Sequence, residues 1–180
     1  MAFKLKSYLL VGTRLVSVDV YGYATRSIPG IDIVGLGSRG KLIREKINFI
    51  TNQYKIKRRE AKRYVISVEC EVGEDKLKNL YSDLEFPILI LYWSMASIIS
   101  LKNLDKCWST GSVNVDFEIK CPLLPKLYSK DYIANLDHQR ILISPHCAIN
   151  KMMVAPVAHI AWEDLIRDYL NIGLPSNEDG

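Results

Sequence analysis

The chain has 180 residues, of which 48% are hydrophobic and 24% are charged, and its formal net charge is +4. This composition excludes an intrinsically disordered chain, and the length is sufficient to bury a core within one ordinary domain. The four cysteines include no CxxC pair, a pattern that argues against a disulfide framework and against a zinc site.

The first half of the sheet is predicted from alternating apolar residues. Residues 4–13 form a predicted strand, and residues 14–23, in which Val16, Val18 and Val20 alternate with polar residues, form a second strand paired with it in a hairpin. A Pro29-Gly30 turn and a short strand at 31–34 follow. A dinucleotide-binding fold would instead open with the strand that leads into its glycine-rich corner.

A glycine-rich corner comes next and leads into an amphipathic helix. Gly35, Gly37 and Gly40 match the dinucleotide motif GxGxxG, and the same stretch nearly matches the phosphate-binding motif GxxxxGK. Leu42 stands where the second motif needs a hydroxyl residue, and Glu60, at the spacing of the first motif's acidic residue, lies in a basic run rather than at a strand end. The corner is therefore predicted to be structural, and a nucleotide- or phosphate-binding enzyme that uses it is the alternative.

Positive charge is concentrated near the front of the chain. Residues 1–65 contain 14 Lys and Arg against 4 Asp and Glu, whereas the remainder contains 10 against 16. Such a basic run attracts phosphate backbones through the release of counterions. A solvated loop between helix and strand is the other interpretation, because no aromatic residues are interleaved to stack on bases. The predicted nucleic-acid-binding residues are Lys55, Lys57, Arg58, Arg59, Lys62 and Arg63.

The nearly continuous apolar stretch from 86 to 101 spans 16 residues, fewer than the roughly 20 that cross a bilayer. It is predicted to be a buried core helix, and no membrane partner is expected. The other predicted elements are a strand at 64–70, an irregular surface connection at 71–84, strands at 108–119, 140–144 and 154–160, and helices at 126–135 and 162–170. One domain is expected over 1–174, with a disordered tail at 175–180.

A family resemblance covers most of the chain. The run VSVDVYGYATRSIPGIDIVGLGSRGKLIREKINFI, residues 16–50, resembles the start of the competence protein ComM and its magnesium-chelatase-subunit-I-like relatives. Residues 62–68, 85–88 and 111–116 resemble later family segments in the same order. The resemblance implies a Lon-protease-like α+β domain, with helices packed on a mixed sheet. In that family the domain accompanies a ring-forming ATPase that acts on DNA during natural transformation.

The resemblance also shows where catalytic groups would lie. The family's serine nucleophile would fall at Glu85, Ser82 lies a turn too early, and Lys126 is the only candidate for the lysine. Because a carboxylate cannot replace the attacking hydroxyl, we expect no enzyme activity and assign no catalytic, cofactor-binding or metal-binding residue. His138 and His146 are predicted to lie in surface loops, and His159 falls within the strand predicted at 154–160.

These features predict a non-catalytic binding or assembly module in bacterial DNA processing, located in the cytoplasm. DNA, an AAA-type ATPase subunit and a second copy of the chain are its candidate partners. Besides the phosphate-binding enzyme, a degenerate stand-alone fragment with no retained activity is an open alternative.

Overall fold

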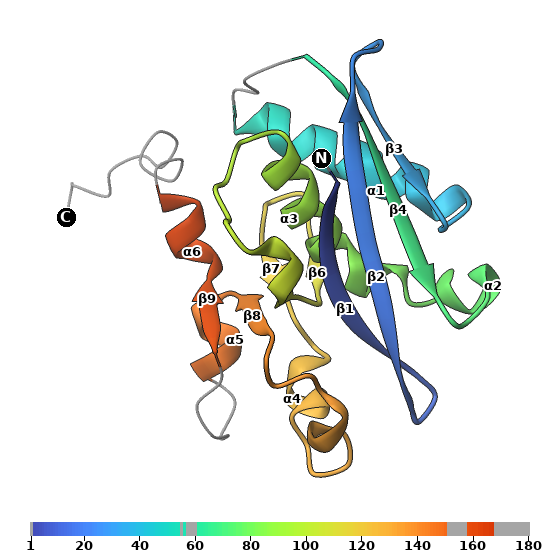
Figure 1. Ribbon diagram of the computed structural model, residues 1–180, viewed down its shortest axis with the longest axis vertical. Coiled ribbons are helices and arrows are strands. Elements are labelled where there is room, and N and C mark those ends of the chain that lie inside the picture. Colours follow the sequence, from blue (N-terminus) through green and yellow to red (C-terminus); the bar gives the residue numbers. More distant parts are fainter. Residues whose placement is uncertain (1, 55, 57–60, 151–157, 168–180) are drawn as a thin grey trace.

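A computed structural model describes residues 2–54, 56, 61–150 and 158–167 of the chain. Its main feature is a mixed seven-stranded sheet in the order β3-β4-β2-β1-β5-β8-β9 (Figure 1). Helices α1 and α3 contribute to the same hydrophobic core as the inward-facing residues of the central strands. The α+β class with a mixed sheet is therefore confirmed.

The long antiparallel strands follow the predicted alternation. Strands β1 (Phe3–Val11) and β2 (Arg14–Thr25) form a hairpin, and β4 (Arg63–Cys70) pairs antiparallel with the other side of β2. Val16, Val18 and Val20 are buried, as expected for a strand with one face on the core.

Strand β3 (Gly30–Val34) pairs parallel with β4, and α1 (Ser38–Gln53) connects the two on the core side. The predicted helix is confirmed, since Ile43, Ile47 and Ile50 are all buried. Their spacing of three and four residues is the reason that this helix packs through one face.

Helix α3 (Glu85–Met95) lies at the centre of the domain, and all eleven of its residues are buried. The expected core helix is therefore confirmed, but it ends six residues before the predicted limit of 101. Ser97 adopts a positive φ of 57° just after the last turn, which stops the helix. Within the described ranges, no helix has the length and apolarity to span a membrane.

The connection from 71 to 84 is more ordered than predicted. It contains the short helix α2 (Glu74–Leu77) and the 3₁₀ turn η1 (Tyr81–Leu84). Leu77 and Leu84 are buried in the main core, so two apolar residues anchor a segment that otherwise reads as polar surface.

The predicted strand at 108–119 is wrong, because the segment forms three two-residue strands: β5 (Cys107–Trp108), β6 (Ser112–Val113) and β7 (Ile119–Lys120). Gly111 has a φ of 145° and Phe117 a φ of 63°, so the chain bends twice. The second bend turns the Phe117 ring onto Trp93, with 5.4 Å between centroids. If the segment were one continuous strand, Phe117 would not make this aromatic contact.

The remaining predictions are partly corrected. The helix expected at 126–135 is divided into α4 (Leu124–Leu127) and η3 (Ile133–Asn135), whereas the strand at 140–144 is confirmed as β8 (Ile141–Ser144). The other elements are η2 (Leu104–Lys106), α5 (His146–Asn150), β9 (His159–Ala161) and α6 (Trp162–Leu165). Residues 154–157 and 168–180, which include parts of two predicted elements and the predicted tail, lie outside the described residues.

Candidate functional site

The glycine corner brings backbones into close contact. Gly35 has a φ of 97°, and a Cβ at this position would collide with the carbonyl oxygen of Val68 in β4. Gly40, in the first turn of α1, faces β3, where a Cβ would lie 2.9 Å from the Ile33 carbonyl oxygen. Steric and dihedral requirements therefore account for these glycines without a bound nucleotide.

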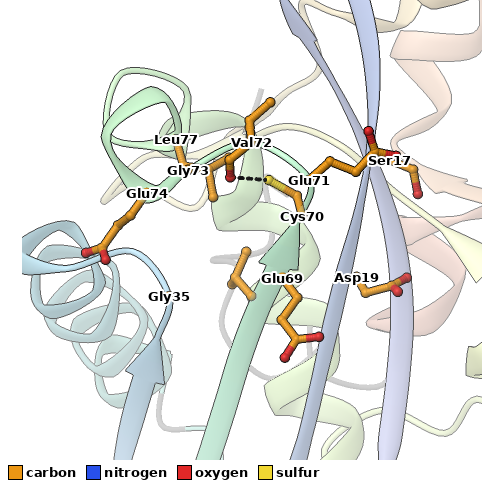
Figure 2. A pocket seen from close by; sticks show the side chains of 11 residues that line it. Ser17, Asp19, Gly35, Glu69, Cys70, Glu71, Val72, Gly73, Glu74 and Leu77 are labelled. Carbon is orange, nitrogen blue, oxygen red and sulfur yellow. Dashed lines mark hydrogen bonds between the residues drawn. The ribbon is translucent and has the colours of Figure 1, made fainter.

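Beside this corner, at the carboxyl ends of β3 and β4, lies a hollow of about 630 Å³ (Figure 2). The ends of parallel strands are a common place for ligands in α/β sheets. None of the eleven described residues that line this hollow carries a positive charge. Its carboxylates are Asp19, Glu69, Glu71 and Glu74.

The carboxylate of Glu74 occupies the place where a phosphate would be expected. Its Oε1 atom lies against Gly37, the residue that precedes the first turn of α1. Figure 2 shows the Glu74 side chain extending toward the loop that contains Gly35. A carboxylate at a helix N-terminus interacts favourably with the helix dipole and repels a second anion. The charge of the hollow thus disfavours the phosphate-binding alternative.

Some of these acids already have basic partners on the outer face of the sheet. Asp19 lies 3.2 Å from Lys4 Nζ and 3.5 Å from Lys6 Nζ, and Glu71 lies 2.5 Å from Arg14. The outer face is therefore a polar surface of mixed charge. The lysines pair with Asp19 but do not line the hollow itself.

The predicted nucleic-acid-binding residues are only partly described. Lys62 and Arg63 lie at the start of β4, whereas Lys55, Lys57, Arg58 and Arg59 lie outside the described residues. Arg63 Nε donates to Asp32 Oδ2 at 2.6 Å, so its guanidinium already has an anionic partner on β3. In the strand register Arg63 is paired with both Thr25 and Gly30, which places the β2–β3 turn at the same end of the sheet.

The position at which the family's nucleophile would fall is occupied by a buried ion pair. Glu85, at the start of α3, is 4% exposed, and Lys46 of α1 donates a hydrogen bond to its carboxylate. Burial raises the pKa of Glu85, although the Lys46 ammonium and the Val113 N–H oppose the change. Burial and the charge of Glu85 likewise raise the pKa of Asp83. Lys46 is not among the buried residues of α1, so the helical pattern gives no sign of this pair. A buried acid needs a partner, and only that requirement could have indicated it.

One serine–lysine contact does occur, but its chemistry is unsuited to catalysis. Lys6 Nζ donates to Ser17 Oγ at 3.0 Å while it also pairs with Asp19. A nucleophile is activated by a base that accepts its proton, whereas the carboxylate stabilises Lys6 as a protonated donor. This contact therefore stabilises the sheet surface.

The strand predicted at 154–160 is confirmed at His159, which begins β9. His159 is a partly buried residue of β9, and its Nε2 atom lies 2.9 Å from Ser144 Oγ and 3.1 Å from the Ser144 carbonyl oxygen. Burial lowers the pKa of His159. Ser144 is fully buried at the end of β8, so its hydroxyl cannot reach a substrate in this arrangement. His138 is exposed outside the helices and strands, and His146 is exposed at the start of α5.

Among the residues that the structure describes, no group of three or more His, Cys, Asp or Glu side chains is arranged to hold a metal ion. Comparison with known proteins finds no matching family model and no matching curated protein.

Proposed function

We propose that this chain is a non-catalytic binding module that acts in bacterial DNA processing in the cytoplasm and contacts the DNA backbone through its basic segment at 55–63. The resemblance to the ComM family supports this process and a ring ATPase as a further partner. The buried Glu85–Lys46 ion pair at the nucleophile position supports a role without peptidase chemistry.

The observation that carries the proposal is the opposite charge of the two ends of the β3–β4 pair. At the end where both strands begin, Lys62 and Arg63 follow the four other cations of the basic run, and the exposed Arg26 lies in the adjacent turn. At the other end the charged residues that line the hollow are all carboxylates; Asp19 and Glu71 are paired with cations outside it, which leaves Glu69 and Glu74. A polyanion is attracted to the first end and repelled by the second, so DNA would bind in one orientation.

The test is to replace three central cations together, Lys57→Ala, Arg58→Ala and Arg59→Ala, and to measure binding of labelled single- and double-stranded DNA by fluorescence anisotropy across a salt series. Affinity should fall about equally for unrelated sequences, because phosphate contacts carry no base information. The slope of log K against log salt concentration is roughly −0.9 for each phosphate that the protein neutralises. Loss of three cations should therefore make this slope shallower by up to about three times 0.9.

A control variant of equal net charge removes three exposed lysines from other elements: Lys76→Ala, Lys102→Ala and Lys106→Ala. It should retain most of the salt slope of the wild-type protein. Unchanged affinity in the first variant, or an equal loss in both variants, would contradict a localised DNA contact at 55–63.

A further inference from the structure

We propose that the open edge of β3 binds an extended acidic segment of a partner protein, which adds to the sheet as a further strand. None of the residues that line the groove beside it belongs to the basic segment at 55–63. Three observations support the proposal: the state of the edge, the groove beside it and the charge of that groove.

The first observation is the unpaired backbone of β3. Within the described ranges β3 pairs only with β4 and stands at the end of the seven-stranded order (Figure 1). The Gly30 N–H donates to the Lys62 carbonyl at 3.2 Å. Because hydrogen-bonding direction alternates along a strand, Ile31 directs its N–H and C=O, and Ile33 its N–H, toward the open edge. The Ile33 carbonyl lies against Gly40 of α1.

Two of the features that usually prevent strand addition are missing from this edge. Natural edge strands are often protected by lysine, proline or a bulge, and the sequence GIDIV of β3 contains neither lysine nor proline. Val34 is 54% exposed, and Ile28, just before the strand, is 78% exposed. An incoming strand could bury these apolar side chains while it pairs with the free peptide groups.

The second observation is a groove of about 410 Å³ between β3 and α1. Gly40 lets the helix backbone approach Ile33, which keeps α1 beside the edge strand. Residues of β3 and α1 both line the groove, together with Val65 of β4. The groove therefore follows the strand whose peptide groups are open.

The third observation is charge. Lys41, which is exposed, and Arg44, which is half-buried, line the groove from α1. The one carboxylate in the lining, Asp32, is already paired with Arg63 at 2.6 Å. The electrostatic potential at the groove is therefore positive, and it favours an acidic segment over a basic one. A peptide fits better than DNA, because only a peptide can use the free N–H and C=O groups and cover Val34.

The probe for the test is a fluorescent peptide of alternating Val and Glu residues. It should bind the wild-type protein, and a peptide of alternating Val and Lys should not. The double variant Lys41→Glu and Arg44→Glu should bind roughly tenfold more weakly or worse, since two attractive charge contacts with the peptide become repulsive. The control variant Lys102→Glu and Lys106→Glu, which changes the net charge equally, should bind as the wild-type protein does.

A second probe tests strand pairing on the unaltered protein. The same Val–Glu peptide, N-methylated at alternate residues, loses the donors of one edge and should lose binding when the pairing edge is methylated. Strand addition would be overturned if both methylated peptides, one for each edge, still bound, or if the parent peptide did not bind.

Two further outcomes would assign the groove to another occupant and overturn the proposal. One is a loss of DNA binding in the Lys41→Glu and Arg44→Glu variant without any change in peptide binding. The other is a concentration-dependent dimer, seen by sedimentation, that this variant abolishes while the peptide fails to bind. The DNA test changes residues 57–59 and the peptide test changes residues 41 and 44, so either proposal can fail alone.

Discussion

Two parallel strand pairs stand at opposite edges of the same sheet and are held together differently. The β3–β4 pair shares five residue pairs and is connected through α1, which has 16 residues. The β8–β9 pair shares three, and only the five-residue α5 is described between its strands. In the first pair, buried isoleucines and close backbone contacts at glycine accompany an ion pair between Arg63 and Asp32. In the second, a side-chain hydrogen bond between Ser144 and His159 joins the strands.

The difference indicates which perturbation each edge can resist. A pair whose backbones fit closely around glycine should be sensitive to added volume. A pair joined through a titratable side chain should respond to pH over the range in which that side chain changes charge. Gly35→Ala and His159→Gln test this contrast, and Lys46→Met tests the ion pair between α1 and α3.

The largest effect is expected from Gly35→Ala at the β3–β4 edge. The new Cβ would collide with the Val68 carbonyl, and the φ of 97° is unfavourable for alanine. We expect the free energy of unfolding to fall by roughly 4 kcal/mol, as measured by urea denaturation. Gly73→Ala is the matched control: its φ is −64° and a Cβ there meets no atom within 4 Å, so the change should stay within about 0.5 kcal/mol. Equal stability of the two variants would refute the close-contact explanation.

A smaller loss is expected from Lys46→Met, which leaves the Glu85 carboxylate buried without its partner. The cost at neutral pH should be about 3 kcal/mol, because an uncompensated buried charge must be tolerated or neutralised. Burial already raises the pKa of Glu85, and loss of Lys46 raises it further. The protonated acid therefore contributes stability below the ordinary glutamate pKa, and this contribution is lost as pH rises through the raised value.

Urea denaturation of the Lys46→Met variant at several pH values checks this expectation. The deficit relative to the wild-type protein should shrink toward low pH, and the double variant Lys46→Met and Glu85→Gln should recover much of it. Lys41→Met, on the exposed side of the same helix, should have little effect. A deficit independent of pH would show that Lys46 acts through packing of its aliphatic chain.

The smallest effect concerns the β8–β9 edge and its pH dependence. Burial lowers the pKa of His159 below its ordinary value of 6.5, so folding favours the neutral ring. Its contribution to stability is complete above pH 6.5 and is lost as pH falls through the lower value in the folded protein. Thermal melts between about pH 7 and pH 5 should show that the stability difference between wild-type protein and His159→Gln narrows as pH falls. The exposed His138→Gln control should show a constant difference, and a constant difference for His159→Gln as well would exclude its titration as the cause.

Predictions from sequence succeeded where the chain repeats its own pattern over many residues. Val16, Val18 and Val20 alternate strictly, and Ile43, Ile47 and Ile50 keep helical spacing, so burial of one face follows from the backbone period. The strand expected at 108–119 failed although Val113, Val115 and Phe117 alternate as well. Phe117 leaves the pattern to reach Trp93, and Val115 is left 51% exposed.

For the candidate sites, the sequence identified the basic run and the glycine corner but not what surrounds them. It gave no sign that Glu74 lies against Gly37, that Arg63 pairs with Asp32, or that β3 ends the sheet with Lys41 and Arg44 beside its open edge. Each of these arrangements joins residues from different elements, and their distances depend on strand order.

By itself the sequence determined the α+β class, the long strands, the two main helices and the strong separation of charge along the chain. These features depend on composition and on hydrophobic periods of two or three to four residues, which involve only residues close together in the sequence. Only the tertiary structure decided that Lys46 meets Glu85, which is 39 positions away, and that His159 meets Ser144. Such contacts depend on packing and register, and a shift of one residue in a strand would turn every side chain to the opposite face.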